Sequence, residues 1–454
     1  MFWVASTSTI VIMICIYYYC RRTTWKIKLL TFRMHKVINK SQQNKKQVQR
    51  LLKEIYMLLN KSIGSHDQVT AYKLIDLLKL AFGYGMMRQD ESVRLMAVSV
   101  AALNKGNPDT VSFILDAFKP LIRQIAPEFV PSAAEQLTLI GAIALKKKQK
   151  FLFAKVAECI FLIMERPDAT GDKKIITSVI EALKVIGVLS LRRRDIALFR
   201  EISIRLSSWF NGNQVTVDIT ENLITMLSAW LHRIIGLNET ALFDILEESS
   251  YSLVKSNVLL ETKLDLLFEE WGNLAASACL NPNSQIAGRI IDVLFTLASM
   301  NDDSRRWPRT ISIAGRVAKL AVSRHGIAVA FMSFYPMLEM GRKLLWSELR
   351  FVQCIDECRQ EMLFAIVRES LLIISFASKQ DLVGSSGQTI VDLYKCWVEN
   401  PAMAGKQKSI KKYCQLLLLF WLKDKRKVRK NLPHNNDLTE PMLFSDSERQ
   451  RFRI

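Results

Sequence analysis

Glycine and proline are scarce in this chain, with 17 and 11 residues among 454. This scarcity disfavours a disordered chain and favours long helices. The sequence has one brief alternation of β-branched residues, at residues 215–219, and no strand–turn–strand pattern accompanies it. Half of the residues are apolar, and we predict an all-α fold.

Paired cysteines are also missing. The eight cysteines form no CxxC pair and no dense cluster, which excludes a disulfide scaffold and argues for reduced thiols. Cys354 and Cys358 are one helical turn apart, but no second pair of Cys or His completes the four ligands that zinc prefers. We therefore predict no metal site and no cofactor.

Catalytic signatures are absent as well. A phosphate-binding loop needs G-x4-G-K-[ST] after a strand, whereas NPAMAGKQ at residues 400–407 has Asn in place of the first Gly and Gln in place of Ser or Thr. His232 and His325 are isolated, and no G-x-S-x-G motif occurs. We predict no enzyme, no catalytic residues and no small-molecule substrate.

Acidic residues are nearly missing from two flanks of the chain. Residues 21–61 carry twelve Lys or Arg against Glu54, and residues 406–430 carry ten against Asp424. These two segments account for the whole formal charge of +20, so the remaining residues sum to zero. A basic flank beside a membrane span has anionic lipid as its natural partner.

Charged residues are lacking altogether from residues 2–20. As a helix this stretch would be about 28 Å long, enough to cross the hydrocarbon core of a bilayer. Aromatic residues lie at both of its ends, and Arg21, Arg22, Lys26 and Lys28 follow. The positive-inside rule then predicts a single-pass anchor in a cell membrane, with the N-terminus outside and the body cytoplasmic.

We expect this membrane to be a bacterial plasma membrane. Two other readings of residues 2–20 stay open. A cleaved signal peptide would need a basic start and an A-x-A site, neither of which is present. A buried helix of the fold is the other alternative.

Two stretches of the body resemble each other at an offset of 46 residues. EQLTLIGAIALKKKQKFLF at residues 135–153 matches EALKVIGVLSLRRRDIALF at residues 181–199, including Gly141 and Gly187. Two helices per unit and a period of about 45 residues resemble the HEAT and armadillo type of α-solenoid. A glycine inside a helix costs about 1 kcal/mol relative to alanine, so we attribute both glycines to close helix packing.

The chain therefore divides into four predicted segments. They are the anchor at residues 2–20, a basic juxtamembrane and amphipathic segment at 21–63, a helical-repeat body at 66–425 and a basic-then-polar tail, predicted to be disordered, at 426–454. Residues 45–63 form an amphipathic helix that either lies on the membrane surface or packs as the first helix of the body.

Two sets of basic residues are the candidate contact sites. Membrane-surface contacts are expected at Arg21, Arg22, Lys26, Lys28, Lys423, Lys425, Arg426, Lys427, Arg429 and Lys430. A partner-binding edge is expected at Lys146, Lys147, Lys148, Arg192, Arg193 and Arg194, if the repeats stack in register. The alternative for these two triplets is that Lys and Arg simply favour the C-terminal ends of helices.

The predicted function is a membrane-anchored cytoplasmic scaffold or adaptor that binds protein partners near the anionic membrane surface. Solenoids offer long surfaces for such partners. The alternative is a membrane-tethered nucleic-acid-binding protein that uses the basic edge and the C-terminal basic run. No nucleic-acid-binding module is recognisable, which makes this alternative the weaker one.

Overall fold

The computed structural model describes residues 24–37, 45–83, 91–169, 171–210, 217–255, 261–280, 285–300, 306–346, 356–380, 386–401 and 404–429. Every regular element in these residues is a helix, which confirms the predicted all-α class. None of the described helices has the length and apolar character needed to cross a membrane. The anchor predicted at residues 2–20 lies outside the described residues.

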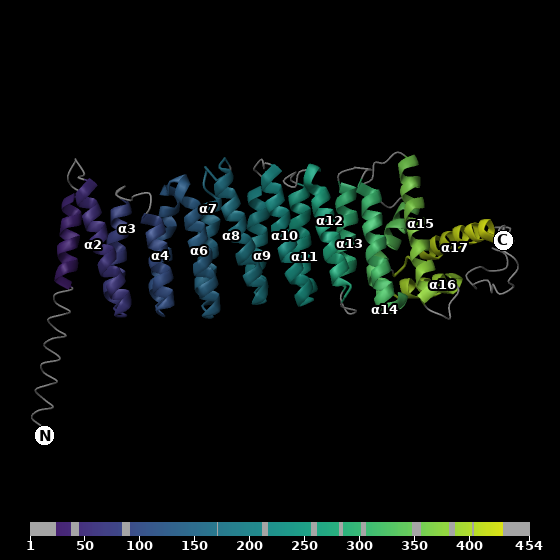
Figure 1. Ribbon diagram of the computed structural model, residues 1–454, viewed down its shortest axis with the longest axis horizontal. Coiled ribbons are helices and arrows are strands. Elements are labelled where there is room, and N and C mark those ends of the chain that lie inside the picture. Colours follow the sequence, from purple (N-terminus) through teal and green to yellow (C-terminus); the bar gives the residue numbers. More distant parts are fainter. Residues whose placement is uncertain are drawn as a thin grey trace, which may run out of the picture. The chain divides into compact units, whose positions relative to one another are not determined.

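The chain forms two compact units, residues Met1–Asn222 and Leu223–Ile454. The first described element of unit 1 is a helix over residues 24–37 (Figure 1). Its further elements are α2 (Lys45–Gly64), α3 (Gln68–Gly83), α4 (Glu91–Asn104), α5 (Pro108–Phe118), η1 (Lys119–Gln124), η2 (Pro127–Phe129), α6 (Val130–Lys146), α7 (Lys150–Met164), α8 (Lys173–Arg192), α9 (Ile196–Phe210) and the start of α10 (Val217–Leu237).

Unit 1 is a stack of helical hairpins. The first helices of successive hairpins, α2, α4, α6 and α8, contact one another in that order, and so do the second helices α3, α5, α7 and α9. One hairpin cannot bury its apolar face alone, and stacking joins the faces into a continuous core. Ile140 and Leu183, which occupy neighbouring hairpins of this core, are fully buried. The described residues therefore show a helical-repeat fold.

The same turn closes each of the hairpins α2–α3, α4–α5, α6–α7 and α8–α9. One residue adopts a positive φ between 54° and 80°, at His66, Gly106, Lys148 and Arg194. The amide of the next residue then donates to a carbonyl in the last turn of the first helix, as Gln149 does to Ala144 O at 2.8 Å and Asp195 does to Ser190 O at 3.0 Å. This is the Schellman arrangement, which satisfies the carbonyls that a helix end leaves open.

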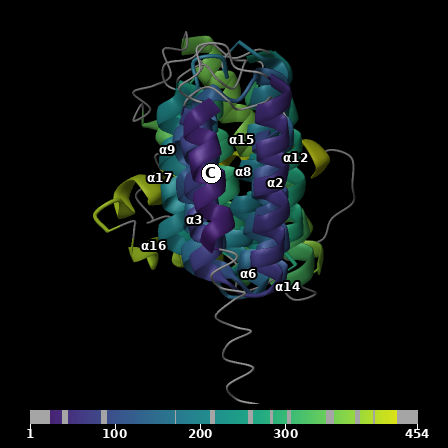
Figure 2. The ribbon, with the colours of Figure 1, turned by 90° about the vertical axis from the view of Figure 1, so that its left-hand side faces the viewer.

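The structure shows where the amphipathic segment at residues 45–63 lies. Val48, Leu51, Leu52, Ile55 and Leu59 of α2 are buried, so the amphipathic segment at 45–63 packs as a helix of the body. Figure 2 shows the helix of residues 24–37 and α2 in front of the later helices of unit 1. The two helices run antiparallel, because Ile27 lies beside Leu58 and Arg33 pairs with Glu54 at 3.9 Å.

Unit 2 starts with helices that alternate between two layers, and its last helices depart from this pattern. Its elements are the rest of α10, α11 (Thr240–Lys255), α12 (Glu261–Ala278), α13 (Ile286–Met300), α14 (Arg306–Leu345), α15 (Asp356–Gln380), α16 (Ser386–Val398) and α17 (Gln407–Arg429). α11 contacts α13 and α12 contacts α14, as in a hairpin stack. α14 is two helices joined at Gly326, whose φ of 72° breaks the helical backbone.

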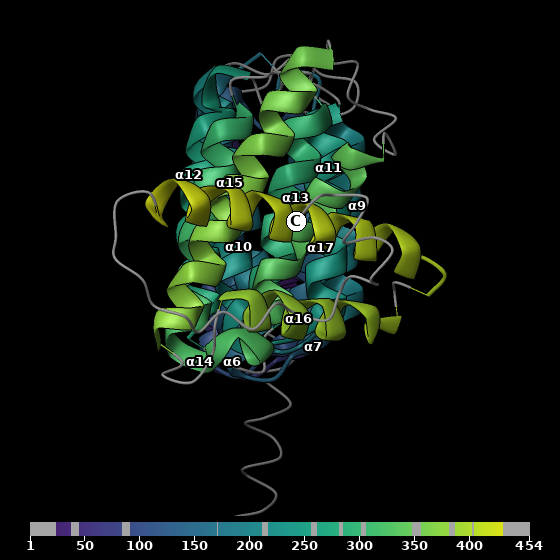
Figure 3. The same ribbon diagram turned by 90° about the vertical axis from the view of Figure 1, so that its right-hand side faces the viewer.

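The last two helices of unit 2 lie across the others. α16 and α17 both contact α14 and α15, and they run crosswise to these helices (Figures 1 and 3). α17 extends to Arg429, so the tail predicted from residue 426 begins inside a helix. Residues 430–454 lie outside the described residues.

Candidate functional site

The two copies of the repeated stretch expose equivalent apolar side chains. Leu139 of α6 is 44% exposed and Val185 of α8 is 37% exposed, and their numbers differ by the same 46 residues as the two stretches. α6 and α8 are in direct contact. Each exposed side chain is followed by a fully buried isoleucine, Ile140 or Ile186, that holds its helix in the core.

The basic triplets lie at the ends of the same two helices. Lys146 is the last residue of α6 and Arg192 is the last residue of α8, and both are exposed. Each lies seven residues after Leu139 or Val185, which is about two helical turns and therefore the same face. We call Leu139, Lys146, Val185 and Arg192 the α6–α8 edge.

The middle residue of each triplet contacts the preceding hairpin. Lys147 Nζ donates to the carbonyl oxygens of Leu103 at 2.5 Å and Asn104 at 3.0 Å, at the C-terminal end of α4. Arg193 Nη2 donates to the carbonyl oxygen of Leu145 at 2.7 Å, near the end of α6. These carbonyls carry the negative end of the helix dipole, so each cation stabilises the neighbouring helix end.

The last residue of each triplet forms the turn itself. Lys148 and Arg194 have φ values of 62° and 54°, and both side chains are exposed. The triplets thus combine three roles within three residues. The first residue belongs to the exposed face, the second ties two hairpins together, and the third reverses the chain.

The two glycines of the repeat lie on the inner side of their helices. Gly141 and Gly187 are buried. A Cβ at Gly141 would lie 2.9 Å from Cδ1 of Ile186 and 3.3 Å from Cγ1 of Val156, so α8 and α7 approach it closely. These positions face the core and not the α6–α8 edge.

Two ion pairs join α7 to α5 and to η1. Lys155 of α7 pairs with Asp116 of α5, and Lys119 Nζ contacts Glu158 Oε2 at 2.6 Å. Between these charges, burial raises the pKa of Cys159 to about 12. A thiol with this pKa stays protonated at neutral pH and is a poor nucleophile.

Only part of the predicted membrane-contact set falls within the described residues. Lys26 and Lys28 are exposed on the helix of residues 24–37. Arg21, Arg22 and Lys430 lie outside the described residues. Lys423, Lys425, Arg426, Lys427 and Arg429 are on α17, and their side chains also lie outside that description.

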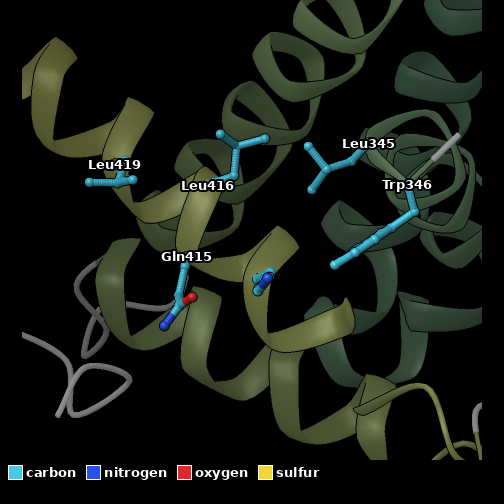
Figure 4. A pocket seen from close by; sticks show the side chains of 6 residues that line it. Leu345, Trp346, Gln415, Leu416 and Leu419 are labelled. Carbon is cyan, nitrogen blue, oxygen red and sulfur yellow. The ribbon is translucent and has the colours of Figure 1, made fainter. Parts of the chain in front are cut away.

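A pocket of about 410 Å³ lies in unit 2, between the end of α14 and α17. It is lined by Leu345, Trp346, Lys412, Gln415, Leu416 and Leu419 (Figure 4). The Lys412 ammonium lies 5.0 Å from the centre of the Trp346 ring, a cation–π distance. These walls suit an apolar side chain better than a polar substrate.

Metal-binding side chains do not gather in the part of the chain that the structure describes. No group of three His, Cys, Asp or Glu residues there is placed to hold an ion. Of the two cysteines one helical turn apart, Cys358 is half-buried on α15 and Cys354 lies outside the described residues.

No protein-family model matches this chain, and no curated protein matches it either. Among solved structures, the chain is similar to one described as a circular tandem repeat protein with novel repeat topology and enhanced subunit contact surfaces. That likeness has 14% sequence identity and a TM-score of 0.30, and covers 90% of this chain and 97% of the other. The helical-repeat assignment rests on the stacked hairpins themselves.

Proposed function

We propose that this protein is a membrane-anchored scaffold of the HEAT or armadillo type, which binds a protein partner along the α6–α8 edge. The observation that supports this most is the pairing of an exposed apolar side chain with an exposed cation on each of two stacked helices. Leu139 with Lys146 and Val185 with Arg192 repeat the same chemistry from one hairpin to the next.

The chemistry of the edge defines the partner. Apolar side chains at the centre of a contact and charges at its rim are the usual anatomy of a protein interface. The complement of this edge is an acidic segment that carries apolar side chains at helical or extended spacing. Opposite charge would speed the encounter, and burial of Leu139 and Val185 would slow dissociation.

Site-specific crosslinking tests the edge. A photo-crosslinking amino acid replaces Leu139 or Val185 in the full chain, and Ile204 of α9, 55% exposed, is the control position. We expect the same partner adduct at positions 139 and 185, and not at 204. Equal adducts at all three positions would mean that the contacts are non-specific.

Charge reversal supplies the second arm of this test. Lys146→Glu together with Arg192→Glu should remove the adduct at position 139, because both cations of the edge become anions. Lys150→Glu changes an exposed lysine at the start of α7 and should leave the adduct in place. An adduct that survives the double reversal contradicts the proposed site.

The membrane part of the proposal rests on the uncharged residues 2–20 and the basic residues that follow them. Deletion of residues 2–20 should move the chain from an alkali-resistant membrane fraction into the soluble fraction. A chain that remains resistant to alkaline extraction after the deletion is held by something else.

The nucleic-acid alternative uses the same basic residues. Two of the six triplet cations, Lys147 and Arg193, are engaged with backbone carbonyls, which leaves fewer for phosphates. Binding to RNA or DNA that weakens steeply with salt, and that the double charge reversal removes, would favour this alternative.

A further inference from the structure

The helix of residues 24–37 has two apolar faces on opposite sides. Ile27, Leu30, Met34 and Val37 are buried, on the side where the helix lies against α2. Trp25 and Phe32, by contrast, are 66% and 65% exposed. Half-buried Leu29 lies between them, and a spacing of four and three residues places all three on one stripe.

The charged side chains that this helix places around the exposed stripe are all positive. Lys26, Lys28, Arg33 and Lys36 are exposed on this helix, and residues 24–37 contain no Asp or Glu. Among them, Arg33 has an acidic neighbour, Glu54 of α2, at 3.9 Å. We call Trp25, Leu29 and Phe32, with these four cations around them, the N-terminal face.

The helix that carries the N-terminal face is the outermost described helix at one end of the hairpin stack of unit 1 (Figures 1 and 2). The terminal helix of a repeat protein normally has a polar outer face, which keeps the array soluble. A tryptophan and a phenylalanine at this place are therefore unusual and need a partner surface. Positive charge rules out a second copy of the same face, because the cations of the two copies would repel each other.

We propose that the N-terminal face lies flat on an anionic lipid surface, with Trp25, Leu29 and Phe32 inserted at the level of the headgroups. Tryptophan favours this interface because it has an apolar ring and a polar N–H. Lysine and arginine at the sides of the stripe meet the lipid phosphates, as in other interfacial helices. Residue 20 ends the uncharged segment and precedes Trp25 by five positions, so an anchor at residues 2–20 keeps the start of this helix close to the lipid surface.

This placement rests on the proposed anchor and sets the direction of unit 1. α2, α4, α6 and α8 follow one another away from the face, and packed helices are spaced by about 10 Å. The ends of α6 and α8 then lie about 30 Å or more from the lipid. The Debye length at physiological salt is about 8 Å, so the basic triplets are left for a protein partner and not for the membrane.

Photo-crosslinking to lipid tests the N-terminal face in the full chain. p-Benzoyl-phenylalanine replaces Phe32, and in a second chain it replaces Phe151 of α7, which is the same residue type with the same exposed fraction of 65%. Both chains are reconstituted into phosphatidylcholine vesicles with or without phosphatidylglycerol. We expect lipid adducts at position 32 in greater yield with phosphatidylglycerol, and none above background at position 151.

The outcomes separate this inference from the proposed function. A chain that stays in the vesicles but gives no lipid adduct at position 32, or equal adducts at 32 and 151, overturns the lipid contact and leaves the anchor intact. A protein adduct at position 32 replaces the lipid by a protein partner and also overturns the inference. A chain that does not enter vesicles at all overturns both proposals.

Discussion

Close helix contacts at single glycines decide which of them tolerate a side chain. A Cβ at Gly288 of α13 would lie 1.9 Å from the backbone oxygen of Met332, and a backbone atom cannot move aside as a side chain can. A Cβ at Gly236 of α10 would meet nothing within 4 Å. Gly141 is intermediate, because its closest neighbour is the terminal methyl of Ile186.

We therefore expect Gly288→Ala to lower the free energy of unfolding by about 3 kcal/mol or more, because it forces α13 and α14 apart. Gly236→Ala should instead raise it by up to about 1 kcal/mol through helix propensity. Urea unfolding followed by circular dichroism measures both changes. Similar effects of the two substitutions would contradict the close contact at Gly288.

Arg166, two residues after the end of α7, is buried and joins polar groups from three positions of the chain. Its guanidinium donates to the carbonyl oxygens of Ile122 at 2.5 Å and Ile125 at 2.7 Å, and it pairs with Asp168 at 2.6 Å. The hydrogen bond from Arg166 lowers the pKa of Asp168 below its usual value of 3.8. The carboxylate is therefore more acidic in the folded chain than in the unfolded chain.

A depressed acid contributes stability above its unfolded pKa and loses it as the pH falls through its folded pKa. Asp168→Asn should thus destabilise the protein at neutral pH. The difference from the parent chain should narrow below pH 3.8, where Asp168 takes up its proton. Thermal unfolding across this range measures the effect, and a difference that is independent of pH would show that the pair contributes by packing alone.

At the scale of elements, the hairpin turns have the same backbone shape but different residues, so residue type alone does not reveal the repeat. Four turns share one backbone shape, but the residue with positive φ is His66, Gly106, Lys148 or Arg194. Only one of these is the glycine that usually marks such a turn. Lysine and arginine in this conformation carry a backbone strain of about 1 kcal/mol.

Substitutions of these turn residues test whether the turns are equivalent. Lys148→Gly should change stability by less than about 1 kcal/mol in either direction, because relief of strain is offset by the greater freedom of glycine in the unfolded chain. Gly106→Ala lacks that relief and should cost about 1 kcal/mol. Equal losses from both substitutions would mean that the turns are not equivalent.

The middle cations of the triplets join one hairpin to the next. Lys147→Met and Arg193→Met keep the aliphatic stems but remove the hydrogen bonds to the ends of α4 and α6. Each should lower stability by about 0.5–1 kcal/mol. Lys146→Met is the control and should be nearly neutral, since Lys146 is exposed and belongs to the α6–α8 edge. A loss as large at Lys146 as at Lys147 would contradict this division of roles.

The hairpin period could be predicted because both copies of the repeat keep their apolar spacing, glycine and basic triplet at one offset. The same local comparison could not show that Lys147 and Arg193 contact a neighbouring hairpin, since residues 43 to 48 positions away supply the carbonyls. The close contact at Gly288 could not be predicted from the sequence for the same reason. Its tight neighbour, Met332, lies on another helix.

At the scale of the whole molecule, the position of each charge matters more than the total of +20. The sequence places the excess of positive charge in two flanks. The assignment of Lys26 and Lys28 to the membrane rested only on their position next to residues 2–20. The exposed Trp25 and Phe32 beside them could not be distinguished from core residues, because an amphipathic pattern does not say which of two apolar stripes faces the fold. Only packing against α2 separates them.

The order of the helices in unit 1 determines which charges lie close enough to the lipid to affect its contact with the N-terminal face. Lys28→Glu with Lys36→Glu reverses two cations of the N-terminal face and should reduce the lipid adduct at position 32. Lys146→Glu with Arg192→Glu should leave that adduct unchanged, because those residues lie several Debye lengths from the surface. The same vesicle crosslinking assay measures both pairs. An equal loss in both would show that net charge, and not the N-terminal face, holds unit 1 against the membrane.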